Sequence, residues 1–141
     1  MVMTNTVNLD WKGGMLFDSV APEGNVLIES AEEFGGKGVG MRPKALMLTS
    51  LAGCSALDIV SLLEKMRAQV KDFKIEVTGE LTDEHPKYYH KVHVIYKFYD
   101  SEFKKDKIEK AINLSVERYC GVMEMFRKFS EVTTEIQYIT E

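Results

Sequence analysis

Hydrophobic positions are densest between Arg42 and Val70, and their distribution predicts one long helix around which the chain is built. Pro43 suits a first helical turn, where its missing N–H has no helical partner to lose. Apolar side chains then cover most of the helix circumference, which is typical of a helix in a core or a subunit interface. Polar residues interrupt the stretch, whereas a membrane span needs about 20 unbroken apolar residues. We therefore predict a buried central helix.

One narrow polar seam runs along this helix. Ser50, Cys54, Asp58 and Ser61 follow one another at spacings of four, four and three residues, which places them on one helix face. A thiol lies in the middle of the seam. We predict that the functional site is there.

Short alternating segments before the helix predict a three-stranded meander. Val7, Leu9 and Trp11 fall on one face of a first strand, and Gly13-Gly14 forms a two-residue turn into a second strand. Residues 21–25 form the next turn, before a third strand over residues 26–28. The glycine-rich residues 34–40 predict a flexible connector, with a mobile loop beside Cys54 as the alternative.

The second half of the chain predicts a β-hairpin, a helix and a closing strand. Residues 73–81 and 89–99 alternate as two antiparallel strands, and Phe73, Ile75 and Val77 face inward. Helical spacing resumes near Lys104, along a face formed by Ile108, Ala111, Ile112, Ser115, Tyr119, Met123 and Phe126. A last strand spans residues 132–139. The order predicts one α+β domain over residues 1–141, with an antiparallel sheet packed on two helices.

The central helix is more apolar than one small sheet can cover. This predicts a dimer with the helix buried between two subunits, although a single curled sheet could also cover it. The net charge of −4 argues against general nucleic-acid or anionic-membrane binding, which normally requires a basic excess. Because the first residues lack a basic region followed by an apolar one, we expect a cytoplasmic protein.

Cys54 and Cys120 are the only cysteines of the chain. They lack the spacing of a CxxC motif, and a permanent disulfide is not expected in the cytoplasm. Gly121 predicts a break, so that Cys120 begins a short helix over residues 122–128, where the helix N-terminus would lower the pKa of its thiol. Either cysteine alone could be an inert core residue. The sequence pattern does not establish whether Cys54 and Cys120 lie close to each other in the fold.

Other polar residues point to less specific roles. Glu117 and Arg118 are interpreted as surface charges flanking a buried Tyr119. His90 and His93 lie three residues apart on one strand and therefore point to opposite faces, so we predict no metal site there.

Two segments of the chain form a distinctive combination. The first is the proline-led helix from Pro43 to Val60, which carries Ala52-Gly53-Cys54, and the second runs from Leu114 to Cys120. Together they resemble the OsmC/Ohr family of osmotically induced and organic hydroperoxide resistance proteins. The order of elements agrees over essentially the whole chain. The resemblance implies an OsmC-like fold and a tightly intertwined homodimer with two active sites at its interface.

The resemblance also implies a reaction. Cys54 would be the thiolate that attacks the O–O bond of a hydroperoxide and becomes a sulfenic acid, and Cys120 would resolve it as a disulfide. An external dithiol would reduce that disulfide, and no bound cofactor or metal is expected. An apolar site would favour organic hydroperoxides, since alkyl burial is worth about 0.8 kcal/mol per CH₂. The alternative is a non-catalytic dimer that binds a small lipophilic ligand or acts as a redox sensor.

The chain departs from the family pattern at several positions. Lys44 stands where characterised members have a glutamate, and no arginine precedes Arg42, although members use an N-terminal arginine to activate the thiol. Arg42 or Lys44 is therefore the candidate source of positive charge. Asp58, one turn beyond Cys54, would oppose ionisation of that thiol if the two are close. Gly121 replaces the proline that often follows the second cysteine.

Overall fold

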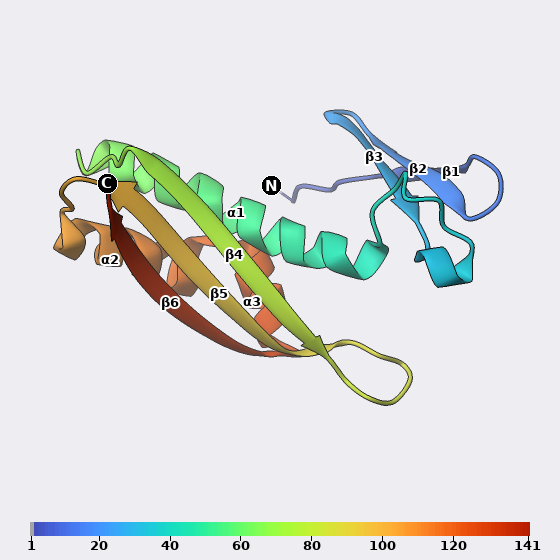
Figure 1. Cartoon of the computed structure of the whole chain (residues 1–141). Coiled ribbons are helices and arrows are strands. Elements are labelled where there is room, and N and C mark those ends of the chain that lie inside the picture. The colour runs from blue at the N-terminus through green and yellow to red at the C-terminus, as the bar shows by residue number, and fades with distance from the viewer. Residues whose placement is uncertain (1) are drawn as a thin grey trace. The chain divides into compact units, whose positions relative to one another are not determined.

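The computed structural model describes residues 2–141, which form a mixed α+β chain of two compact units. The smaller unit ends at Met47 and the larger one runs from Leu48 to Glu141. The long helix α1 (Pro43–Lys65) begins in the smaller unit and continues through the larger one (Figure 1). The α+β class is confirmed, whereas the extent of a single domain stays a prediction.

The smaller unit is the predicted meander. Its strands are β1 (Asn8–Trp11), β2 (Leu16–Ala21) and β3 (Gly24–Glu29), paired antiparallel in the order β1-β2-β3. Gly13 and Gly14 form the first turn with φ of 96° and 56°, a backbone conformation that favours glycine. The first strand starts at Asn8, and the apolar face containing Leu9 and Trp11 is exposed.

The connector after β3, which includes the short 3-10 turn η1 (Glu32–Phe34), is held by one buried carboxylate. Glu29 is only 5% exposed, and its oxygens accept the backbone N–H groups of Lys37 at 2.9 Å, Val39 at 2.8 Å and Gly40 at 3.0 Å. These hydrogen bonds lower the pKa of Glu29, and the bond from the Gly40 N–H contributes most.

Close backbone approach explains the glycines of this segment. A Cβ on Gly40 would lie 2.9 Å from the carbonyl carbon of Ile28, and one on Gly36 would overlap the carbonyl oxygen of Ser30. The connector is therefore an organised loop, in contrast to the flexible one expected from its composition.

The larger unit contains the second sheet, with strands β4 (Asp72–Leu81), β5 (Tyr89–Asp100) and β6 (Glu131–Thr140) in the order β4-β5-β6. β4 and β5 form the predicted antiparallel hairpin. β6 pairs parallel with β5, so the expectation of an antiparallel sheet is wrong at this edge. The helical connection after β5 carries the chain back along the sheet, and such a crossover is what a parallel neighbour requires.

Three helices cover one face of this sheet (Figure 1): α1, α2 (Lys105–Leu114) and α3 (Gly121–Arg127). The core between the layers is formed by Leu51, Ile59, Leu63, Ala68, Tyr89, Val92, Val94, Tyr96, Phe98, Ile108, Ala111, Ile112, Cys120, Met123 and Phe126. α1 ends at Lys65, earlier than expected, because the positive φ of 55° at Arg67 turns the chain away from the helix.

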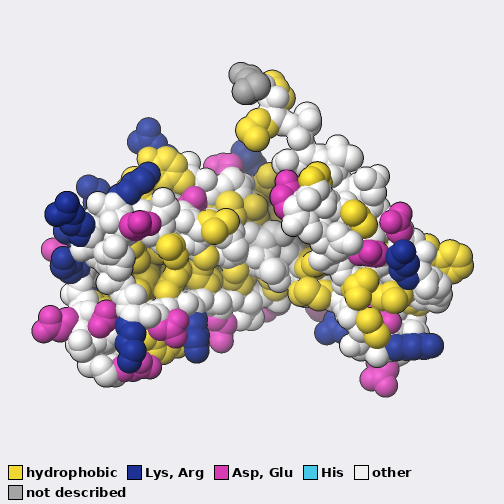
Figure 2. All heavy atoms as spheres, turned by 90° about the horizontal axis from the view of Figure 1, so that it is seen from above, with side chains coloured by type: hydrophobic (Ala, Val, Ile, Leu, Met, Phe, Trp, Pro, Cys, Tyr) yellow, Lys and Arg dark blue, Asp and Glu magenta, His cyan; other side chains and the backbone are white. Residues whose placement is uncertain are grey.

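α1 has one face in this core and a second apolar face outside it. Leu51, Ser55, Ile59 and Leu63 are buried, whereas Leu57 is 76% exposed. Hydrophobic side chains gather in a band across the larger unit in Figure 2. By length and composition α1 could cross a membrane, contrary to expectation, although a core helix meets the same criterion.

The loop bonds of Glu29 lead to a pH-dependent prediction. Glu29→Gln should destabilise the protein at pH 7, because the charged acceptor of three N–H groups is lost. A carboxyl whose pKa is lowered by folding stabilises the protein above its unfolded pKa of about 4.3. That stabilisation disappears as pH falls through the folded pKa, so the difference between wild type and variant in urea midpoint should shrink at acid pH.

Glu23→Gln, in an exposed turn, is the matched control and should change little at either pH. If the urea midpoints of wild type and Glu29→Gln differed by the same amount at pH 7 and at pH 3, the role assigned to the Glu29 charge would be contradicted.

Candidate active site

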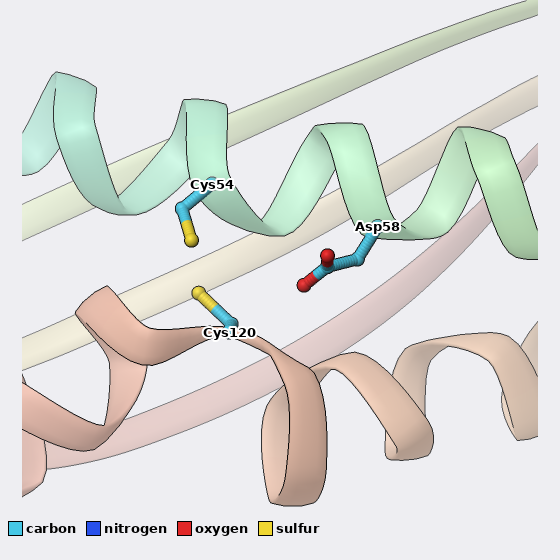
Figure 3. A group of neighbouring side chains, drawn as sticks. All are labelled: Cys54, Asp58 and Cys120. Carbon is cyan, nitrogen blue, oxygen red and sulfur yellow. The ribbon is translucent and has the colours of Figure 1, made fainter. Parts of the chain in front are cut away.

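Two cysteines and an aspartate meet between α1 and the C-terminal helices (Figure 3). Cys54 and Asp58 project from successive turns of α1 toward Cys120, which is the N-cap of α3. The two sulfur atoms and a carboxylate oxygen of Asp58 all lie within 4.8 Å of one another. The structure thus joins the two cysteine motifs and the aspartate of the polar seam in a single site.

A local widening of the helix places Cys120. After α2 the chain forms a π-helical turn, η2 (Ser115–Tyr119), closed by a bond from the Cys120 N–H to the Ser115 carbonyl at 2.8 Å. Cys120 then leaves the helical conformation, and its Sγ accepts the N–H of Met123 at 3.3 Å as the cap of α3. The predicted break and new helix are confirmed.

The π turn also overturns one sequence expectation. Tyr119 was expected to be buried, since it follows Ser115 at helical spacing, but it is 52% exposed. A π turn carries an extra residue, so side chains beyond it no longer follow the face that a regular α-helix would present.

Burial controls the chemistry of Cys120. The thiol is 3% exposed, and the loss of solvent raises its pKa to about 11. The Met123 N–H acts in the opposite direction, while Cys54 and Asp58 add to the increase. The expected lowering by the helix N-terminus is therefore wrong, because desolvation exceeds the effect of one N–H donor. Cys120 is a protonated thiol at neutral pH.

A chain of buried hydroxyl groups supports Asp58. Ser115 donates to Asp58 Oδ2 at 3.1 Å and lies 3.3 Å from the Ser55 hydroxyl, which in turn lies 3.2 Å from the hydroxyl of Tyr96. Ser55, Ser115 and Tyr96 are fully buried, and burial raises the pKa of Tyr96. Sequence reasoning gave the two serines no role at the site. The sequence did contain a signal for both residues, because Ser55 and Ser115 each lie on an otherwise apolar helix face.

The other residues considered from the sequence are two basic residues near the start of α1 and two histidines on the second sheet. Arg42 precedes α1 and Lys44 lies in its first turn, both in the smaller unit, so their action on Cys54 stays a prediction. His90 contacts Glu80 at 2.6 Å, and His93 contacts Thr133 and Glu135 on the neighbouring strand. His90 and His93 thus each have a separate partner on the sheet.

Comparisons with known proteins agree with this architecture. The family model described as OsmC-like protein matches residues 35–135. Protein YhfA of Escherichia coli K12 is 27% identical over 129 residues, which cover 92% of this chain and 94% of YhfA. A hypothetical protein from Aquifex aeolicus VF5 superposes with a TM-score of 0.87 at 26% identity, with 99% of each chain covered.

A more distant match shares the fold. The organic hydroperoxide resistance protein OhrB of Bacillus subtilis has a TM-score of 0.67 at 18% identity, covering 96% of this chain and 98% of OhrB.

The difference in burial between the two thiols predicts unequal labelling. The raised pKa of the Cys120 thiol, about 11, keeps it protonated at pH 7, and its side chain is buried. Iodoacetamide should therefore modify Cys54, which is half-buried, long before Cys120. Peptide mapping by mass spectrometry measures both rates, and urea-unfolded protein, in which the rates should converge, is the control. Faster labelling of Cys120 in the folded protein would contradict this assignment.

Proposed function

The chain belongs to the OsmC-like protein family, and from that premise we propose that it is a thiol-dependent peroxidase that reduces organic hydroperoxides. The observation that carries the proposal is the proximity of the Cys54 and Cys120 sulfur atoms, which two separate helices bring within 4.8 Å. The sulfenic acid that a peroxide forms on a cysteine is reversible, and a second thiol nearby can trap it as a disulfide before further oxidation. The name of OhrB supports the substrate class.

Cys54 is the proposed nucleophile, because it is the more accessible of the two cysteines. Its thiolate attacks the terminal oxygen of the hydroperoxide and the O–O bond breaks. The remaining alkoxide takes up a proton and leaves as an alcohol, and Cys54 becomes a sulfenic acid. The sulfur is oxidised by two electrons and the hydroperoxide is reduced by two.

Cys120 then resolves the sulfenic acid. Its sulfur attacks Cys54 Sγ, the S–S bond forms, and the sulfenic oxygen leaves as water after taking the Cys120 proton. Asp58 is the proposed carrier of that proton, since a carboxylate oxygen lies within 4.8 Å of both sulfurs and Ser115 holds the carboxylate in place. An external dithiol reduces the disulfide and restores both thiols.

One further feature completes the proposal. The apolar surroundings favour alkyl hydroperoxides over hydrogen peroxide, because each buried CH₂ contributes about 0.8 kcal/mol.

Disulfide mapping tests the proposed cycle. Reduced protein treated with one equivalent of cumene hydroperoxide should rapidly form a Cys54–Cys120 bond, detected by mass spectrometry. Cys54→Ser should abolish peroxide consumption, whereas Cys120→Ser should consume one equivalent and accumulate the sulfenic acid or its further oxidation products. Hydrogen peroxide at the same concentration should react more slowly.

The contrary result is two unmodified thiols after prolonged exposure to cumene hydroperoxide. That result would exclude the peroxidase activity and favour the alternative, a non-catalytic OsmC-like dimer that binds a small lipophilic ligand in an apolar pocket at its interface.

We also propose that the protein is a homodimer in which the exposed face of α1 is covered. Leu57 and Val60 are 76% and 55% exposed, and covering such side chains is worth about 1.5–3 kcal/mol each. Light scattering at micromolar concentration should give twice the chain mass of 16.1 kDa. Leu57→Glu should shift the protein toward monomer with its circular dichroism unchanged, since Leu57 is outside the core.

Glu109→Lys, an exposed charge reversal on α2 and away from the Leu57 face of α1, is the control and should leave the mass at that of a dimer. A wild-type monomer at this concentration would contradict the proposed assembly.

A further inference from the structure

The site contains three metal-binding groups of complementary chemistry. Cys54 and Cys120 offer two sulfur atoms and Asp58 offers a carboxylate oxygen, all within 4.8 Å of one another. Thiolate and carboxylate are both ligands of Zn²⁺, and two sulfurs in one site favour Zn²⁺ over the hard ions Mg²⁺ and Ca²⁺.

The geometry is close to what one Zn²⁺ requires. Zinc–sulfur bonds of about 2.3 Å and zinc–oxygen bonds of about 2.0–2.2 Å in a tetrahedron place neighbouring ligand atoms roughly 3.5–4 Å apart. The three atoms are already near that range, and Figure 3 shows all three side chains directed toward a common point.

The surroundings of the ligands also suit a metal. Ser115 donates to Asp58 Oδ2 and thereby orients the carboxylate, as outer partners of ligating groups usually do. The buried Ser55 and Tyr96 hydroxyls hold Ser115 in turn. Cys54 is half-buried and Cys120 is buried, so a fourth ligand would reach the site past Cys54.

We propose that the reduced protein binds one Zn²⁺ per chain through Cys54, Cys120 and Asp58, with water as the fourth ligand. Binding uses the same two sulfurs that a disulfide would consume, so metal and disulfide exclude each other. Zn²⁺ therefore blocks the thiols while it is bound, and oxidation of the cysteines releases it. The metal site requires only the three side chains, and it stands whether or not the thiols reduce hydroperoxides.

Cobalt and zinc titrations test the site directly. Reduced protein should bind one equivalent of Co²⁺ and show sulfur-to-cobalt charge-transfer bands with the visible bands of tetrahedral cobalt, which one equivalent of Zn²⁺ should abolish. Cys54→Ser and Cys120→Ser should each lose most of the charge-transfer intensity. Asp58→Asn should weaken Zn²⁺ binding at least about tenfold, and Ser115→Ala by about ten- to a hundredfold. Glu64→Gln, exposed on the same helix, should bind as wild type does.

A further test uses only the wild-type protein, so its result does not depend on whether the variants fold. Zn²⁺ should slow iodoacetamide labelling of Cys54, a chelator should restore the rate, and protein with the cysteines oxidised to a disulfide should bind no cobalt. Absence of charge-transfer bands in reduced wild type, or Zn²⁺ binding that survives loss of both cysteines, would overturn the proposal. Neither outcome depends on the reaction with cumene hydroperoxide, so the two proposals can fail separately.

Discussion

The packing of α1 against the sheet and the C-terminal helices is the interaction on which the site depends. Leu51, Ile59 and Leu63 lie one or two turns apart and are buried in the core. Burying each such side chain is worth about 1.5–3 kcal/mol, so this face of α1 has one preferred orientation. That orientation directs Cys54 and Asp58 toward Cys120, which the helical turns after β5 place on the other side of the site.

Burial then separates the chemistry of two identical side chains. Cys120 lies at a helix N-terminus, yet desolvation raises the pKa of its thiol, and neighbouring Asp58 adds to the increase. Cys54 is more accessible. An accessible thiol beside a protected, protonated one suits a sequential reaction, in which only the first sulfur meets the oxidant. The same proximity of two sulfurs and a carboxylate suits a thiophilic metal ion.

Buried polar groups organise both units. In the smaller unit the Glu29 carboxylate holds the loop through three backbone N–H groups. In the larger unit the hydroxyls of Ser55, Ser115 and Tyr96 form a connected chain that ends on Asp58. Buried polar groups are costly without partners, so these bonds select one arrangement of the surrounding backbone.

Local pattern by itself determined the order of elements, the long helix, the hairpin of β4 and β5 and the break before α3, because periodicity and turn residues act over short distances. The family resemblance further indicated that Cys54 and Cys120 belong together. Only the tertiary structure decided that β6 runs parallel to β5, that Tyr119 is exposed, and that the pKa of the Cys120 thiol is raised. These outcomes depend on a crossover, on one extra residue in a helical turn, and on desolvation by residues distant in sequence, and none of them leaves a mark in the local pattern.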